Sequence, residues 1–511
     1  MATDDFFRAR LDQMIDLRHP LALLADRLPW STIVAALASK FALQSTAPRS
    51  ETIDGLFGPE LVAGEVGRGG RPRLPIRLMA GLLYLKNSFD LSDEELVQRW
   101  AENVYFQHFC GMAYFEPRLP CDATQIGRFR RAIGEDGMEL LLKGTIETAV
   151  VSGAIKPQEI ERVIVDSTVQ EKAVAYPTDS RLLEIARHKL VSTAKRLGLG
   201  LKQTFAREGA TLRRRAGGYA HAKQFKRLKK VLRRQRTIVG IVIREIRRKL
   251  AVRLQPGMNA DAEAPNVLTL TAMNTWLERA ERIRSQQPKS KNKLYAMHAP
   301  EVECISKGKA RQPYEFGVKV GLAVTHKSGL MVGARSFPGN PYDGHTLAEQ
   351  LEQVRNLCQD IGVVPKTAVV DLGYRGVDAD NPGVQIIHRG KFKSLTVLQR
   401  RWLKRRQAIE PAIGHTKADH RMERCWLQGA SGDALHALSC ALGYNIRWLM
   451  RALHAKDRLA LLRFLRMAAL GGEQAMAALR TAVTRLVDLH LPGSHHGVWA
   501  ANTCSAGLRA A

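Results

Sequence analysis

The stretch VVDLGYRG, residues 369–376, runs from two β-branched residues into a carboxylate and then reaches two glycines. The valines predict a buried strand, and the glycines predict that it ends in a turn. An ionised carboxylate at the end of a buried strand is costly unless a cation, a hydrogen-bond donor or a metal ion meets it. Asp371 therefore has two open interpretations: it caps the turn made by Leu372 and Gly373, or it belongs to a charged site.

A second stretch, ERVIVDST at residues 161–168, has the same form. Val163, Ile164 and Val165 predict a short strand, and Asp166 is expected to end it. One metal site would explain why two strands of one protein both end in a carboxylate.

The rest of the pattern predicts an α/β fold with a mixed sheet flanked by helices. An amphipathic helix is expected at 345–357, and a hairpin turn at 327–329. Further strands are expected at 293–300, 315–326, 330–338, 367–371 and 384–388, and further helices at 396–412 and 432–453.

A third carboxylate is sought because phosphoryl-transfer sites with two metal ions generally use more than two acidic ligands. Glu410 lies in a basic stretch, four residues after Arg406 and seven before Lys417. On a helix Arg406 and Glu410 would share one face, so a surface ion pair is an equally open interpretation. Pro411 is expected to bend or end that helix.

Length and charge limit the classes of protein that are possible. A chain of 511 residues with 45% hydrophobic residues can form several domains, and a net charge of +29 indicates a polyanionic partner, first of all nucleic acid. A membrane surface is the weaker alternative, since no apolar run could span a bilayer and the N-terminus does not resemble a signal peptide. The seven scattered cysteines predict reduced thiols in a cytosolic protein.

Between residues 181 and 250 the chain carries 22 lysines and arginines against three glutamates. Self-repulsion would favour unfolding of such a segment unless an anion neutralises it, although a charge run is often only a solvated helix face. Aromatic residues are few, which favours contact with duplex phosphates over stacking on single-stranded bases. The residues expected to bind DNA here are Arg213, Arg214, Arg215, Lys226, Arg227, Lys229 and Lys230.

Residues 1–150 have a helical pattern, with a helix at 76–86, a capping box formed by Ser92 and Glu95, and a further helix at 123–143. The basic stretch RGGRPR at 68–73 makes Arg71 and Arg73 candidates for DNA binding. This pattern is compatible with a DNA-binding domain related to the helix-turn-helix. It is equally compatible with an ordinary helical bundle that has a basic face.

In combination, these residues resemble a known family. Asp166, Asp371 and Glu410, with Arg406 and Lys417, are similar to the acidic triad and the arginine–glutamate–lysine signature of DDE transposases of bacterial insertion sequences, of the insertion sequence 5 type. The likeness extends from about residue 50 to about residue 455 and includes the stretches 71–143, 165–183, 306–320 and 336–347.

The resemblance implies an RNase H-like catalytic core in which Asp166, Asp371 and Glu410 hold two Mg²⁺ ions, with Mn²⁺ able to replace them. It implies cleavage of double-stranded DNA at the terminal inverted repeats and transfer of the freed 3′-OH into target DNA, with Arg406 and Lys417 on nearby phosphates. It also implies a homodimer on DNA in the bacterial cytoplasm and no membrane partner.

The expected organisation is an N-terminal helical DNA-binding domain (1–150), a catalytic domain (158–183 and 293–455), a basic helical insertion within it (184–292) and a C-terminal helical tail (456–511). Leu403 departs from the family, which has a tyrosine there. Asp179 and Asp343 are competing acids and rank below the triad as turn formers. A nuclease that cuts without joining and a non-catalytic DNA-binding protein remain alternatives.

Overall fold

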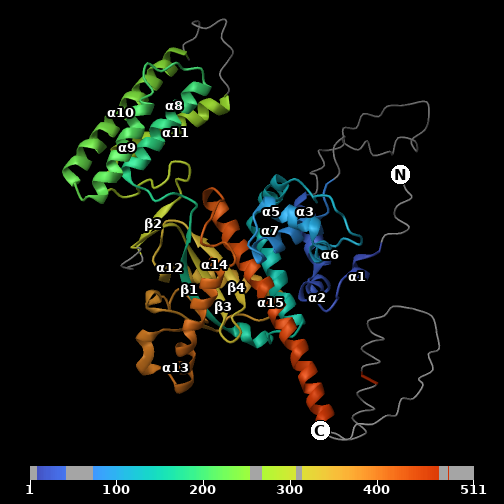
Figure 1. The fold of residues 1–511 in the computed structure, drawn as a ribbon. Coiled ribbons are helices and arrows are strands. Elements are labelled where there is room, and N and C mark those ends of the chain that lie inside the picture. Colours follow the sequence, from blue (N-terminus) through green and yellow to red (C-terminus); the bar gives the residue numbers. More distant parts are fainter. Residues whose placement is uncertain (1–8, 42–72, 254–266, 307–312, 471–480, 483–511) are drawn as a thin grey trace, which may run out of the picture. The chain divides into compact units, whose positions relative to one another are not determined.

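The computed structural model describes residues 9–41, 73–253, 267–306, 313–470 and 481–482 (Figure 1). The chain divides into two units, Met1–Met450 and Arg451–Ala511. The sheet, the helices that pack on it and the site described below belong to the first unit. The long helix α15, Gly429–Leu470, crosses the boundary expected at residue 456.

The described residues form one six-stranded sheet from β1 Arg162–Glu171, β2 Glu303–Ser306, β3 Tyr314–Thr325, β4 Met331–Phe337, β5 Thr367–Val369 and β6 Gln385–Ile387. β3 pairs antiparallel with β1 on one side and with β2 and β4 on the other. β5 pairs parallel with β1, and β6 pairs parallel with β5. Antiparallel strands continued by two parallel ones form the mixed RNase H-like sheet that the sequence predicted.

Two details of the strand prediction are wrong. β1 does not end at Asp166 but continues to Glu171, because β3 pairs with it along its whole length, from Val163 opposite Thr325 to Glu171 opposite Gly317. Residues 293–300 do not form a strand. Leu294 and Met297 in that stretch are buried in the core of the helical insertion, which explains their apolar pattern.

Two helices of the catalytic segment pack on the sheet. α12, Asp343–Leu357, contacts β3 and β4, and α14, Ile409–Ala418, contacts β1. The predicted hairpin turn between β3 and β4 is present, with the Gly329 N–H donating to the Thr325 carbonyl at 2.9 Å. Just beyond the end of β1, the buried Lys172 ammonium binds Glu301 at 2.9 Å and Asp433 at 2.7 Å, which ties the strand to α15.

The N-terminal helices are α1 Leu11–Met14, α2 Pro20–Arg27, α3 Trp30–Phe41, α4 Ile76–Ser88, α5 Asp93–Glu102, α6 Val104–Phe109 and α7 Ala123–Val151. The capping box of Ser92 and Glu95 begins α5, as predicted. These helices also bind the catalytic segment through buried groups: Asn445 donates to the Thr145 hydroxyl at 2.9 Å, and Asn87 donates to the His420 carbonyl at 3.1 Å. The helices therefore share buried contacts with the catalytic domain.

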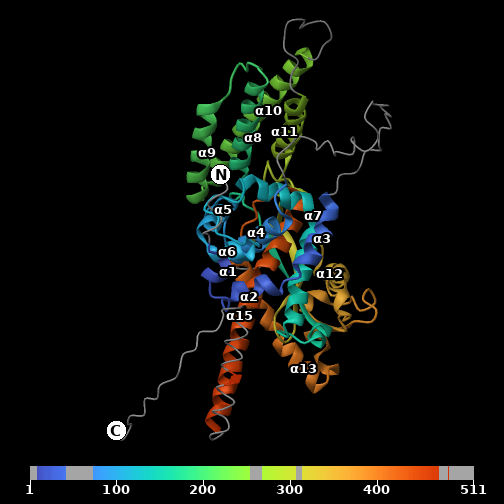
Figure 2. The ribbon, with the colours of Figure 1, turned by 90° about the vertical axis from the view of Figure 1, so that its right-hand side faces the viewer.

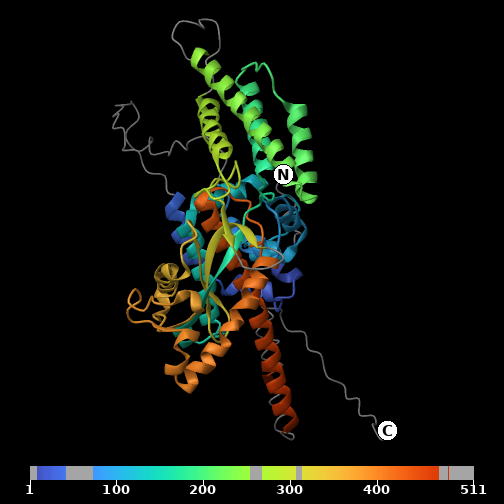
Figure 3. The ribbon, with the colours of Figure 1, turned by 90° about the vertical axis from the view of Figure 1, so that its left-hand side faces the viewer.

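The described part of the basic insertion contains four helices, α8 Asp179–Arg196, α9 Ala206–His221, α10 Phe225–Arg253 and α11 Val267–Ser285. Helices α8, α10 and α11 lie side by side in Figure 1, Figure 2 and Figure 3. Their apolar faces meet in one core that includes Leu190, Ile243, Ile246 and Met273. Burial of this core opposes the self-repulsion of the cations, which lie on the outer faces.

No single helix in the described ranges is long and apolar enough to span a membrane; α2 and α3 meet such a criterion only as a pair bent by 62°.

Candidate active site

The pairing of β1 with β5 brings the two predicted strand acids to neighbouring positions. Val163 lies opposite Ala368 and Ile164 opposite Val369, so the same register, continued by two residues, sets Asp166 opposite Asp371. Asp371 follows β5 and begins the 3-10 turn η5, Leu372–Tyr374, where its Oδ1 accepts a hydrogen bond from the Gly373 N–H at 2.8 Å. The turn-capping interpretation of Asp371 is therefore correct, and it leaves the second carboxylate oxygen for other partners.

The electrostatics of Asp166 reflect a surplus of negative charge. Its Oδ1 accepts from the Ser167 N–H at 2.8 Å, and its Oδ2 accepts from Nη1 of Arg406 at 3.1 Å. Burial, followed by the charge of Asp371, nevertheless raises the pKa of Asp166 to about 6, with a smaller contribution from Asp343. An arginine alone does not compensate the carboxylates, and a bound cation would relieve this repulsion.

Asp343 is a third aspartate at this place, and the sequence ranked it only as a turn former. It is the first residue of α12, and its Oδ1 accepts from the Ser167 hydroxyl at 2.9 Å and from the Lys319 ammonium at 2.8 Å. A β-carbon added to Gly373 would lie 2.9 Å from Oδ2 of Asp343 and 3.0 Å from Oδ1 of Asp371. Glycine at 373 therefore lets two carboxylates approach one small space that any side chain would fill.

Tyr374 closes the same region from inside. Its ring is buried, and burial together with the charges of Asp343, Asp166 and Asp371 raises the pKa of its hydroxyl well above the ordinary value. The phenol therefore stays neutral beside the acids and does not add to their charge.

Glu410 is linked to Asp166 through Arg406. Its side chain is 61% exposed, and Nη2 of Arg406 lies 3.7 Å from its Oε1. Because another nitrogen of the same guanidinium binds Asp166, Arg406 stands between the strand acid and the helical acid. Arg406 lies in the 3-10 turn η7, Arg405–Ala408, and Glu410 in α14, so the expected ion pair forms across two elements.

The expected effect of Pro411 is wrong, and this determines where Lys417 lies. Pro411 occupies the first turn of α14, where its missing N–H breaks no helical hydrogen bond, so the helix continues to Ala418. Lys417 in the last turn lies 3.9 Å from the buried Glu315 at the start of β3. Arg406 thus lies in the turn before α14 and Lys417 in its last turn, and of these two residues only Arg406 contacts Asp166.

The donor set suits a hard divalent cation, although its geometry is incomplete. Among the described residues, no group of three or more His, Cys, Asp or Glu side chains is arranged to hold a metal ion. Carboxylate oxygens are the protein ligands that Mg²⁺ prefers, and the space beside Gly373 already faces Asp343 and Asp371. A site that includes Glu410 would require Arg406 to move away from Asp166.

The cations of the insertion that were predicted to bind DNA are all exposed. Arg213, Arg214 and Arg215 lie on α9, and Lys226, Arg227, Lys229 and Lys230 lie on α10. None of these seven forms an ion pair with a described acid, so their charges are available to an anion.

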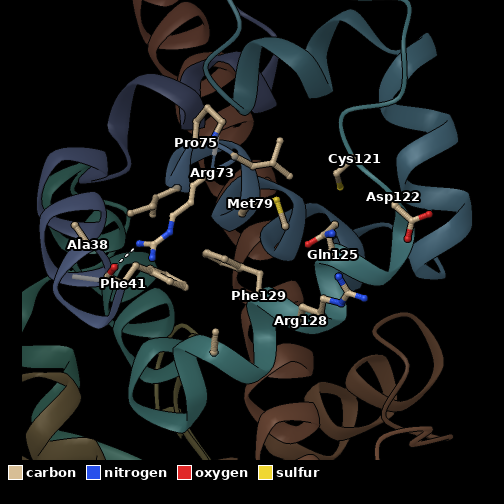
Figure 4. A pocket seen from close by; sticks show the side chains of 13 residues that line it. Ala38, Phe41, Arg73, Pro75, Met79, Cys121, Asp122, Gln125, Arg128 and Phe129 are labelled. Carbon is tan, nitrogen blue, oxygen red and sulfur yellow. Dashed lines mark hydrogen bonds between the residues drawn. The ribbon is translucent and has the colours of Figure 1, made fainter. Parts of the chain in front are cut away.

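The N-terminal candidates differ from one another. Arg73 donates a hydrogen bond to the Phe41 carbonyl and lies over the Phe41 ring, with the guanidinium carbon 5.9 Å from the ring centroid. Figure 4 shows Arg73 turned toward Phe41 in an apolar pocket that Met79 and Phe129 also line. Arg73 therefore contacts its own protein, and Arg71 lies outside the described residues.

Comparison with known proteins agrees with this geometry. Residues 9–132 match the family "Transposase domain (DUF772)", and residues 284–446 match the family "Transposase DDE domain". The protein "Uncharacterized protein ORF8 in nfe locus" from Rhizobium meliloti is 42% identical over 222 residues, which cover 43% of this chain and 95% of that relative. No solved structure matches. The chain therefore belongs to the DDE transposases of bacterial insertion sequences.

Proposed function

We propose that the protein cleaves DNA at the ends of its insertion sequence and transfers the freed 3′-OH into target DNA, in a reaction that requires divalent metal ions. The observation that carries this proposal is that Asp371, two residues beyond the end of β5, lies close enough to Asp166 of the neighbouring strand β1 for its charge to raise the pKa of Asp166. Burial and the charge of Asp371 both raise the pKa of Asp166, and a bound cation would stabilise the charged form of both carboxylates.

Asp166, Asp371 and Glu410 would hold the Mg²⁺ ions, with Mn²⁺ as a substitute. When bound, the ions supply Lewis-acid stabilisation of the phosphate and a water or 3′-OH with a lowered pKa. Arg406 binds Asp166 and Glu410 in this structure. With the acids held by metal ions, the Arg406 guanidinium would be available to bind a phosphate of the DNA strand through paired N–H groups.

Double-stranded DNA is the partner, first the terminal inverted repeats and then the target. The exposed cations of α9 and α10 hold flanking duplex through its phosphates. Two protomers act on the two element ends as a homodimer, in the bacterial cytoplasm. This assembly and location follow from the family alone.

The test uses purified full-length protein with a labelled duplex that carries the terminal repeat found beside its gene. In Mg²⁺ we expect cut ends and, with target plasmid present, joined products on a gel, and we expect neither in EDTA. Cut ends without joined products would assign the protein to nucleases. Binding without cutting in Mg²⁺ or Mn²⁺ would assign it to non-catalytic DNA-binding proteins.

A further inference from the structure

The segment between β6 and α14 has a second, unassigned concentration of charge. From residue 381 to residue 409 the chain contains no acidic residue, whereas it contains eight cations: Arg389, Lys391, Lys393, Arg400, Arg401, Lys404, Arg405 and Arg406. Two of them bind acids elsewhere, Lys391 to Asp378 and Arg406 to Asp166. Arg389, Lys393, Arg401 and Lys404 are exposed and pair with no described acid.

Apolar side chains stand exposed among these cations. The helix α13, Val397–Lys404, contains no buried residue although it is amphipathic. Val397 is 68% exposed, Leu398 55% and Phe392 48%. We call the exposed side chains of residues 389–404 the α13 surface. Exposed apolar side chains in the same segment as unpaired cations indicate a partner that is anionic and that also has apolar surface to bury.

The α13 surface is fixed next to the catalytic acids. The Trp402 ring packs against Arg162, the first residue of β1, at 3.3 Å from the guanidinium carbon to the ring centroid. Arg405 donates to the carbonyls of His326 and Lys327 in the β3–β4 turn. Asp166 lies four residues along β1 from Arg162, a rise of about 13 Å. A duplex that runs from Asp166 toward Arg162 would pass α13, which lies outside the sheet in Figure 1.

We propose that the α13 surface opens the duplex beside the cleavage site. Lys393, Arg401 and Lys404 hold the backbone, while Val397 and Leu398 contact unstacked bases. This proposal rests on the proposed function and adds a separate step to it. A second copy of this chain is a poor alternative occupant, because two molecules that each have a net charge of +29 repel one another.

The step follows from the energetics of apolar wedges. Proteins that insert apolar side chains at a base step compensate the cost of unstacking by additional contact along the bent DNA. Opening the end of an element also exposes the strand that is to be cut. A surface with cations alone would bind paired and unpaired DNA through phosphates, whereas exposed Val397 and Leu398 add a preference for bases that are already open.

The experiment measures binding of full-length protein in EDTA, so that the DNA stays uncut, to a paired duplex and to the same duplex with mismatches at its centre. Wild-type protein should bind the mismatched duplex roughly tenfold more tightly, because the mismatches remove most of the unstacking cost. V397S/L398S should bind both duplexes equally. V151S/V364S, which changes two exposed valines elsewhere, is the matched control and should keep the preference.

The cations are tested separately. K393Q/R401Q/K404Q should weaken binding to both duplexes alike and lower the slope of log affinity against log salt by up to about 3, at roughly 0.9 per phosphate contact. R10Q/R18Q/R118Q is the control, because each of these arginines already pairs with a neighbouring acid.

Equal binding of the two duplexes by wild-type protein, or a preference retained by V397S/L398S, would overturn the inference. Neither result bears on metal-dependent cleavage, which is measured in Mg²⁺. Cleavage without the preference would refute the α13 proposal alone, and the preference without cleavage would refute the proposed function alone.

Discussion

At the scale of single residues, the site is defined by the acids whose charges raise the pKa of Asp166, which are Asp371 and Asp343. Asp343 and Asp179 look alike in the sequence, since each is the only acid in a turn just before a helix. The structure separates them: Asp343 binds Ser167 and Lys319 beside the strand acids, whereas Asp179 lies 3.7 Å from Arg236 in the insertion. Only Asp343 is therefore expected to influence the chemistry.

Asp343→Asn should lower the cleavage rate and the affinity for Mn²⁺ by about 10- to 100-fold, the range found when groups that orient metal ligands are removed. Asparagine can still accept from Ser167, so the fold should persist. Calorimetric titration with Mn²⁺ and a cleavage assay provide the two measurements. Asp179→Asn is the matched control and should change neither; if both variants behave like the wild type, Asp343 has no role in the site.

His436 on α15 gives a prediction for stability. Burial lowers the pKa of His436 to about 4, while its Nε2 bonds the Arg421 carbonyl at 2.9 Å. In the unfolded chain a histidine has a pKa of about 6.5, so the unfolded state binds more protons between these values. The stabilisation is complete above pH of about 6.5 and is lost as the pH falls toward about 4, with a change of about 3 kcal/mol in the free energy of unfolding.

Urea unfolding at several pH values checks this expectation. His436→Gln retains a donor for the carbonyl but does not titrate, so its free energy of unfolding should fall less between neutral and acidic pH. Parallel pH profiles of the variant and the wild type would show that His436 is not the group responsible.

At the scale of elements, the basic insertion shows how a highly charged segment can fold. Helices α8, α10 and α11 bury one apolar core, and the cations of α9 and α10 remain exposed. The same arrangement predicts how the segment binds DNA: through many phosphates, without reading bases.

Neutralising Lys226, Arg227, Lys229 and Lys230 together should lower the slope of log affinity against log salt by up to about 3 to 4, at roughly 0.9 per contact. Preference between specific and random duplexes should remain, because phosphate contacts carry no sequence information. A salt titration of the variant and the parent on both duplexes measures the two quantities. An unchanged slope would mean that these side chains are only a solvated helix face.

Local patterns were sufficient for most elements. The β-branched runs before Asp166 and Asp371 correctly located β1 and β5, because central strands of a sheet are buried on both faces. The strand predicted at 293–300 was wrong for a related reason: Leu294 and Met297 are buried, but in a helical core. A pattern of apolar residues reports burial and does not report which element covers them.

The site was predicted less completely, because its contacts join distant parts of the chain. The register of β1 and β5 sets Asp166 beside Asp371, and a one-dimensional pattern contains no such register. The position of Asp343 near the site depends on the packing of α12 against Gly373. The link between Glu410 and Asp166 depends on Arg406, which pairs with both. Its basic surround made Glu410 a candidate and left a surface ion pair equally open, and the resemblance to the family then added Glu410 to the triad.

At the scale of the whole molecule, a chain with a net charge of +29 brings three aspartates, Asp166, Asp343 and Asp371, close to one another. The N-terminal helices are bonded to the catalytic domain through Asn87 and Asn445, so the specificity of DNA recognition is best tested in the full chain. The central claim is that the paired strand acids bind metal for cleavage and do not serve structure or DNA affinity.

The most direct test compares Asp371→Asn with the wild type in Mg²⁺, measuring cleavage of a terminal-repeat duplex and affinity for that duplex in parallel. Asparagine preserves the side-chain oxygen that caps the Gly373 N–H, so the turn should remain intact. We expect cleavage to be abolished while affinity stays the same or rises slightly, because a charge that repels phosphate has been removed. Cleavage by Asp371→Asn at nearly the wild-type rate would contradict the claim.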